Sequence, residues 1–127
     1  MTVPINDEKR AAVAQFLKEW NAVAACQRPI IIPREKNRDV LIELGLTLTD
    51  QWEILKNLRV EDYVSGPDPD HQRRGDFWVF GVFIGEVEIY IKIKLAEWIP
   101  VGSDETVRQA ICVSFHIAER PLTYPLK

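Results

Sequence analysis

Side chains that could carry acid–base chemistry recur at every second position in two segments of the chain, residues 87–95 and 111–116. The even positions of these segments are polar or titratable: Glu88, Tyr90, Lys92, Lys94, Cys112, Ser114 and His116. The odd positions are apolar throughout. Alternation with a period of two predicts strands that have one buried and one solvated face, so each segment should present its polar residues on one side.

Antiparallel pairing of the two segments must keep their apolar sets on the same side of the sheet. Residues 77–84 are a third strand candidate, apolar on both faces as in a strand that is covered from two sides. The dipeptide Gly85-Glu86 is short enough to connect them to residues 87–95 as a hairpin. Together these segments predict an antiparallel meander whose polar face gathers Tyr90, Lys92, Lys94, Ser114 and His116.

A surface of this composition suits cleavage of RNA without a metal ion. The reaction needs a proton taken from the 2′-hydroxyl, a proton given to the leaving oxygen, and compensation of the charge that builds on the phosphorus centre. His116, whose side-chain type titrates near neutrality, is predicted to act as the acid or base. Lys92 and Lys94 are predicted to stabilise the developing charge, and Tyr90 to donate a hydrogen bond or to stack on a base.

A solvated strand face is the alternative interpretation of the same pattern. Glutamate and lysine at alternate positions often pair across strands on such a face, and His116 could simply end a strand. Cys112 lies on the same predicted face as His116, but four strand residues span about 13 Å, which is too far for a nucleophile and its base. We therefore interpret Cys112 as a small packing residue.

Several familiar sites are excluded by the sequence. It contains no glycine-rich phosphate loop, no cysteines at zinc spacing and no His-Glu-x-x-His motif. Asp68, Asp70 and His71 could bind a cation, but a turn with solvated aspartates explains them better. We accordingly predict neither a metal nor a cofactor.

Length and composition predict one domain, residues 1–127, with 46% hydrophobic residues to build a core. The net charge of −3 gives no global basic field, so a nucleic acid would have to bind a local patch. We expect no membrane span and no secretory signal, because no apolar run is long enough and the start lacks the basic-then-apolar order. Cys26 and Cys112 form no disulfide framework, which favours the cytoplasm.

Three helices are expected before the sheet. Apolar residues at helical spacing predict the first over residues 7–26, with Asn6 as its N-cap. The second should cover residues 36–44 and end at Gly45, where a left-handed C-cap is favoured.

Thr47 or Thr49 is expected to cap the third helix, and Asp50 lies three residues after Thr47, as in a capping box. The proline-bounded residues 29–33 predict an edge strand or an extended crossing. Helices followed by antiparallel strands predict an α+β fold, with N-terminal helices packed on a small antiparallel β-sheet.

Two prolines, a glycine and two aspartates within residues 65–70 predict a loop from about residue 65 to 75. This loop ends in Arg73 and Arg74, in the only tight basic cluster near the predicted sheet, and we expect both to contact RNA phosphates. Residues 98–106 predict a second loop. The tail after His116 contains two prolines and should be extended.

The motifs within these elements resemble the MqsR family of toxins, which are RelE-like mRNA interferases of toxin–antitoxin systems. The resemblance runs from about residue 39 to 116, so residues 39–127 are the toxin-like region and the helix at 7–26 lies outside it. It is carried by these motifs: Leu44-Gly45-Leu46, Glu61-Asp62-Tyr63, Phe77-Trp78, Ile89-Tyr90-Ile91-Lys92-Ile93 and Ile111-Cys112-Val113-Ser114-Phe115-His116. It implies a RelE-like fold and an endoribonuclease whose partners are RNA, a cognate antitoxin protein and the ribosome.

By position, Tyr90 and Lys92 match the family's Tyr-x-Lys strand, and Tyr63 matches an aromatic residue that would contact RNA. The chain departs from the family pattern at three positions: Val64 and Val79 stand where the family has lysine and glutamine, and His116 replaces a lysine. A relative that kept the fold and lost cleavage, acting as a non-catalytic protein-interaction module, is therefore the alternative function. A domain that binds a small molecule between the sheet and the loop is a third.

Overall fold

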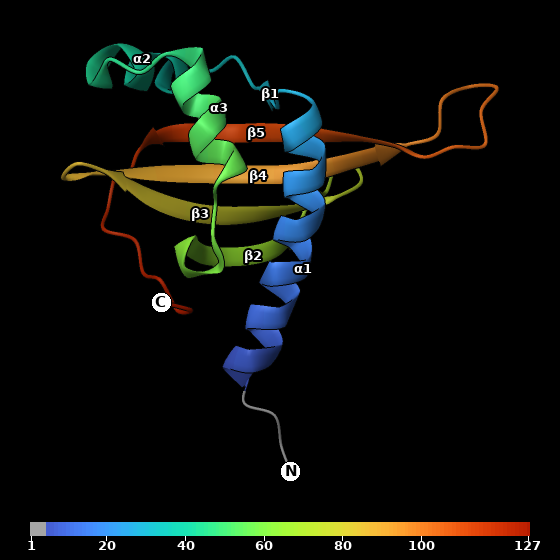
Figure 1. Cartoon of the computed structure of the whole chain (residues 1–127), viewed down its shortest axis with the longest axis horizontal. Helices are drawn as coiled ribbons and strands as arrows, with labels where there is room; N and C mark the ends of the chain where they lie inside the picture. The colour runs from blue at the N-terminus through green and yellow to red at the C-terminus, as the bar shows by residue number, and fades with distance from the viewer. Residues whose placement is uncertain (1–4) are drawn as a thin grey trace.

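The computed structural model describes residues 5–127, in which helices cover one face of a five-stranded sheet (Figure 1). The chain runs through α1 (Ile5–Cys26), β1 (Ile30–Ile31), α2 (Glu35–Leu44), α3 (Leu48–Lys56), the 3-10 turn η1 (Val60–Asp62), β2 (Tyr63–Pro69), β3 (Asp76–Ile84), β4 (Val87–Trp98) and β5 (Val107–Ile117). The strand order is β1-β5-β4-β3-β2. Only the pair β1–β5 is parallel, so the predicted α+β class is confirmed. Within these residues no helix has both the length and the apolar character needed to cross a membrane.

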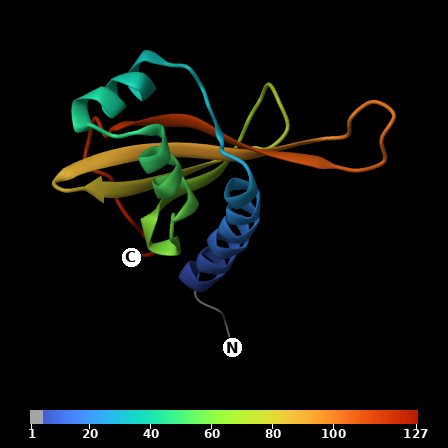
Figure 2. The same cartoon turned by 45° about the horizontal axis from the view of Figure 1, so that its top comes forward.

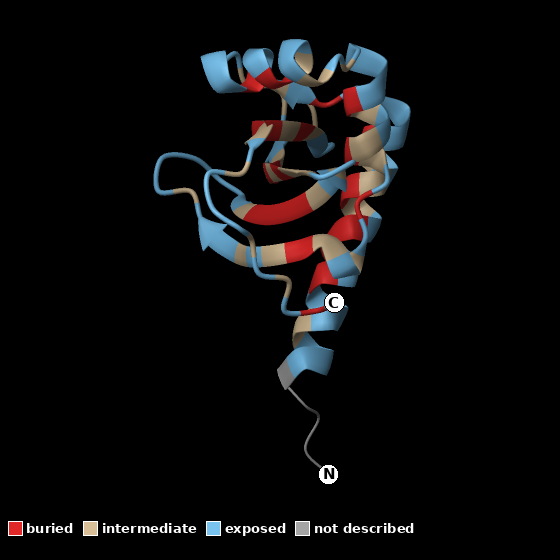
Figure 3. Cartoon of the chain, turned by 90° about the vertical axis from the view of Figure 1, so that its left-hand side faces the viewer, coloured by how far each residue is buried: buried red, intermediate tan, exposed pale blue. Residues whose placement is uncertain are grey.

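Helix α1 forms because its apolar residues share one stripe, and it packs that stripe against α3 and the sheet. The buried members of the stripe are Val13, Phe16, Leu17, Trp20 and Ala24. Trp20 anchors the two helices to each other, since its indole Nε1 donates a 2.8 Å hydrogen bond to the carbonyl of Leu55. Figure 3 shows the buried residues gathered where the helices face the sheet. The prediction of this helix is confirmed, except that it begins at Ile5, so Asn6 lies in its first turn and is not the N-cap.

The predicted signals at the ends of α2 and α3 are confirmed. Gly45 follows α2 with φ at 64°, the left-handed conformation that a residue without Cβ adopts at little cost. Thr47 begins α3 with reciprocal hydrogen bonds: the Asp50 amide donates to Thr47 Oγ1 at 3.0 Å and the Thr47 amide donates to Asp50 Oδ2 at 2.9 Å. These caps fix the short turn between the helices and so orient both against the sheet.

The sheet is wider than the three-stranded meander that we predicted. Residues 30–31 form the expected edge strand, β1, but the loop predicted over residues 65–75 is wrong because its first half is strand β2. Pro67 and Pro69 are tolerated there since β2 lies at the edge of the sheet and its register with β3 shifts twice. The connecting loop is confined to residues 70–75 (Figure 2).

Strand β5 contains a bulge that decides which of its side chains reach each face. Lys92 pairs with Ser114 and the next residue, Ile93, pairs with Cys112, so Val113 has no counterpart on β4. Cys112 therefore enters the core with 0% exposure, which corrects the prediction that it shares a face with His116. Burial raises the pKa of its thiol to about 12, consistent with the packing role. Beyond the bulge, Ser114 lies on the opposite face, which we call the outer face.

The buried side chain of Asn37 supports this bulge. Its Nδ2 donates to the carbonyls of Ile32 (2.9 Å) and Val113 (3.0 Å), and its Oδ1 accepts from the Phe115 amide at 2.9 Å. The parallel ladder between β1 and β5 ends just before, where the Ile32 amide donates to Cys112 at 3.0 Å. The side-chain amide of Asn37 thus continues the bonding of β5 beyond the end of β1, with partners for the Val113 carbonyl and the Phe115 amide.

The C-terminal tail is extended, as predicted, and crosses part of the outer face. The Leu122 amide donates to Glu88 Oε1 at 2.9 Å and the Tyr124 hydroxyl donates to Glu88 Oε2 at 2.7 Å. Tyr124 packs directly over Gly81, where any Cβ would collide with it. Leu126 then enters the core with 2% exposure. The tail covers the end of the sheet near Glu88 and leaves the rest of the outer face open.

We expect Asn37→Asp to lower the free energy of unfolding by about 3 kcal/mol or more, because a buried carboxylate cannot donate to the carbonyls of Ile32 and Val113 and places its negative charge against them. Urea denaturation followed by circular dichroism measures this loss. Asn6→Asp, an exposed change of the same chemistry, should alter the free energy by less than about 0.5 kcal/mol. Equal stability of the two variants would show that the bulge does not depend on Asn37.

Candidate functional site

Four of the five predicted polar residues line one pocket of about 500 Å³ on the outer face, which we call the His116 pocket. Strands β4 and β5 supply Tyr90, Lys92, Ser114 and His116. The register places Tyr90 opposite His116 and Lys92 opposite Ser114, so neighbouring strands hold these side chains side by side. Residues 119–122 of the tail close one wall.

The His116 ring is held in a defined position and tautomer. It stacks on the Tyr90 ring with centroids 5.2 Å apart and planes inclined by 17°. Its Nδ1 lies 3.0 Å from the carbonyl oxygen of Ile117. Because a carbonyl can only accept, Nδ1 is the donor in this contact, and Nε2 is the nitrogen through which the neutral ring would act as a base.

The Tyr90 hydroxyl is a hydrogen-bond donor on the wall of the pocket. Burial raises its pKa, and the negative charge of Asp68 raises it further. The hydroxyl therefore stays protonated at neutral pH, next to the imidazole.

Three cations line the same pocket as the imidazole. Lys92 lies with its Nζ 4.4 Å from the centre of the Phe77 ring, and Arg34 and Arg120 line the same pocket. Among residues 5–127, none of the three has a carboxylate within ion-pair distance. The nearby Glu119 is engaged by Lys36, whose hydrogen bond and charge lower the pKa of that carboxyl. The pocket is therefore positive in a chain that is acidic overall.

Sequence reasoning missed Arg34 and Arg120 because neither belongs to an alternating segment. Arg34 precedes α2 and reaches the pocket only because β1 pairs with β5, far from it in the sequence. Arg120 follows β5 where the chain turns back across the sheet. A short polar linker after a predicted edge strand was the only available signal for Arg34.

Lys94, predicted to stabilise charge beside Lys92, has a different environment. Its side chain is 6% exposed, and its Nζ lies 2.7 Å from Asp70 Oδ2 and 3.3 Å from the carbonyl of Arg74. Asp70 also accepts from the amides of Gln72 and Arg73. Because its charge is compensated by Asp70, we reassign Lys94 from the catalytic group to the anchoring of loop 70–75.

The three predicted RNA-binding residues separate. Arg73 and Arg74 are exposed on loop 70–75 and line a second hollow on the outer face. Tyr63 is only 4% exposed and lies edge-on against Trp78 and Phe80 on the helix-covered face. The prediction that Tyr63 contacts RNA is therefore wrong, since the core encloses its ring.

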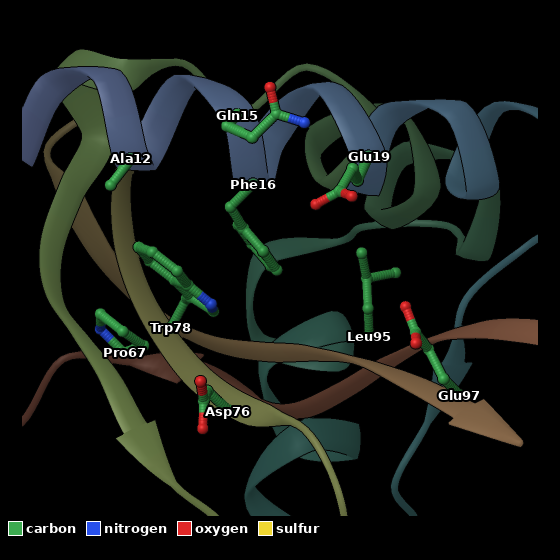
Figure 4. A pocket seen from close by; sticks show the side chains of 9 residues that line it. All are labelled: Ala12, Gln15, Phe16, Glu19, Pro67, Asp76, Trp78, Leu95 and Glu97. Carbon is green, nitrogen blue, oxygen red and sulfur yellow. The ribbon is translucent and has the colours of Figure 1, made fainter.

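A further pocket of about 430 Å³ lies between α1 and the sheet (Figure 4). Phe16 and Trp78 stack in it at 4.6 Å, and the carboxylates of Glu19, Asp76 and Glu97 rim it. Glu19 and Glu97 are both paired with Arg108, and no described lysine or arginine lines the pocket itself, so nothing in it favours a phosphate. Among the described residues, no three His, Cys, Asp or Glu side chains converge on a metal position.

No protein-family model, no curated protein and no solved structure matches this chain. The resemblance to the MqsR toxins stays a prediction, and the residues of the His116 pocket and their surroundings are the structural basis for a function.

We expect Asp70→Asn to lower the melting temperature by several degrees at pH 7, because the buried Lys94 ammonium loses its counter-charge. The ion pair and the two loop amides lower the pKa of Asp70. The stabilisation is therefore complete above its ordinary pKa of about 4 and is lost as the pH falls through the lower folded-state value.

The difference between the parent and Asp70→Asn should accordingly shrink as the pH is lowered from 4 towards 2. Thermal unfolding across this range measures it, with Asp68→Asn, an exposed carboxylate of the same segment, as the control. A difference that is independent of pH would contradict the role of the ion pair.

Proposed function

We propose that this protein is a toxin-like endoribonuclease of the MqsR type that cleaves mRNA in the cytoplasm without a metal ion. The observation that supports this most strongly is the His116 imidazole, stacked on Tyr90 with its Nδ1 at the Ile117 carbonyl, in a pocket that is also lined by three cations without a carboxylate partner within residues 5–127. A phosphodiester is the substrate that such a combination of base, phenol and cations fits. The resemblance adds a RelE-like relationship, an antitoxin partner and the ribosome to the proposal.

The proposed reaction is an attack within the substrate. His116 Nε2 takes the proton of the 2′-hydroxyl, and O2′ bonds to the adjacent phosphorus. The bond from phosphorus to O5′ of the next nucleotide breaks, and Tyr90 gives its proton to that oxygen. The products are a 2′,3′-cyclic phosphate and a 5′-hydroxyl, and the imidazolium then returns its proton to the neighbouring phenolate.

Cations lower the barrier by stabilising the phosphorane. Lys92 on β4, Arg34 before α2 and Arg120 after β5 line the pocket, so a bound phosphate would lie within reach of three positive charges. Groups that are fixed before the reaction stabilise developing charge better than water, which would have to reorient.

A non-catalytic protein-interaction module is the second candidate. Val79, where the MqsR family has glutamine, is opposite Lys92 in the register and only 5% exposed, so this position offers no polar group beside Lys92. The end of the β4–β5 hairpin also exposes Ile99 (61%) and Val101, which could contact a partner protein. This candidate requires that the chain cleave no RNA at any concentration.

We expect His116→Gln to reduce cleavage of single-stranded RNA at least 100-fold, because glutamine cannot take up the proton. Lys92→Met should cause a loss of about 100-fold by removing one fixed charge. His71→Gln, which changes the other histidine of the chain, should leave the rate unchanged because His71 is exposed on loop 70–75 and does not line the pocket.

Gel analysis of a labelled oligonucleotide in EDTA measures these rates, and circular dichroism checks that the variants fold. The same substrate with 2′-deoxyribose at the cleavage position should resist cleavage. Parent-like activity of His116→Gln would exclude the proposed mechanism.

A further inference from the structure

The second hollow on the outer face lies directly beside the His116 pocket. It has a volume of about 580 Å³, and Arg34 lines both cavities. Strand β4 contributes alternate residues to both, first Tyr90 and Lys92, then Lys94 and Trp98. A single extended ligand molecule could therefore lie along β4 and occupy the two cavities at once.

Trp98 gives this hollow an aromatic surface that is open to solvent. Its side chain is 46% exposed, whereas Trp20 and Trp78 are buried in the core. Trp52 is half-buried, and its indole donates to the carbonyl of Ala24. Phe77 lies in the same hollow, but the ammonium groups of Lys92 and Lys94 cover its ring. Trp98 is thus the ring on which an incoming base can stack.

The charges of the hollow leave a positive excess. Asp70 is paired with Lys94, and Glu97 is paired with Arg108 at 2.8 Å. Arg34, Arg73 and Arg74 remain without a carboxylate partner among the described residues. Because Asp70 accepts from the backbone of loop 70–75, the arginines Arg73 and Arg74 extend from an ordered backbone.

We infer that this hollow, the Trp98 groove, binds the single-stranded RNA that flanks the scissile bond. One base stacks on Trp98, and phosphates contact Arg73 and Arg74. The inference rests on the proposed function for the identity of the substrate. It adds a length requirement, because the β4 segment from Tyr90 to Trp98 spans roughly 26 Å. A dinucleotide in the His116 pocket is too short to reach Trp98, whereas an octanucleotide fills both cavities.

The test compares these two substrates in the full chain. Trp98→Ala should weaken binding of a 2′-O-methyl octanucleotide, which cannot be cleaved, roughly tenfold by fluorescence anisotropy, and Trp98→Phe should retain most of the affinity. Cleavage of the octanucleotide should show a raised KM and an unchanged kcat in Trp98→Ala. Cleavage of a dinucleotide should be unchanged.

The salt dependence of RNA binding tests the arginine contacts separately. Arg74→Gln should reduce the slope of log affinity against log salt by about 0.7, the value for one phosphate contact on a single strand. Arg38→Gln, an exposed change on α2, should not alter the slope.

The possible results separate the two proposals. If Trp98→Ala binds the octanucleotide as tightly as the parent does, the Trp98 groove is not an RNA-binding site, even if the parent cleaves RNA. The same conclusion follows if Trp98→Ala reduces cleavage of the dinucleotide as much as cleavage of the octanucleotide. Loss of octanucleotide binding in Trp98→Ala together with a parent that cleaves neither substrate supports the groove and overturns the nuclease.

Discussion

The three hydrogen bonds of the buried Asn37 amide are the interaction on which the outer face depends. They satisfy backbone groups of β1 and β5 at the point where the bulge at Val113 interrupts the regular ladder. Without the bulge, Cys112 and His116 would lie on the same face, so either the thiol would leave the core or the imidazole would enter it. Arg34 lies in the same region, because its carbonyl accepts from the backbone N–H of Asn37 at 3.1 Å at the start of α2. One residue thus supports the strand that carries the imidazole through its side chain and contacts Arg34 through its backbone.

The two faces of the sheet are stabilised in different ways. The helix-covered face is held by close packing of aromatic rings, with Phe16 stacked on Trp78. The outer face has no helix over it among the described residues and uses polar contacts, chiefly the Lys94–Asp70 pair and the hydrogen bonds of Glu88 to the tail. These contacts hold loop 70–75 and the C-terminal tail against the outer face, and the two pockets lie on the surface between them. A binding surface can therefore exist on a small domain without weakening its core.

The sequence predicts the elements whose signals are local. The helices, the Gly45 and Thr47 caps and the hairpin at Gly85 follow from periodicity and turn chemistry within a few residues. The side of the sheet reached by Tyr90, Lys92 and His116 also follows, because alternation is strict in each strand.

The features that the sequence does not predict depend on contacts between residues that are far apart in the chain. The bulge at Val113 leaves the alternation of β5 unbroken in the sequence, since its support comes from Asn37, a residue far away in the chain. Strand β2 was hidden by prolines that only an edge strand tolerates. Lys94 and Tyr63 look like surface residues in the sequence, and their burial is decided by a loop and a helix that pack over them.

The account requires that a phosphodiester bind beside His116, and nuclear magnetic resonance tests this most directly. The chain has two histidines, so the two imidazole Hε1 signals can be assigned with one variant. On titration with a 2′-O-methyl dinucleotide, which cannot be cleaved, the signal of His116 should shift and saturate while that of His71 stays in place. A His116 signal that does not move, or that moves no more than the signal of His71, would contradict the account.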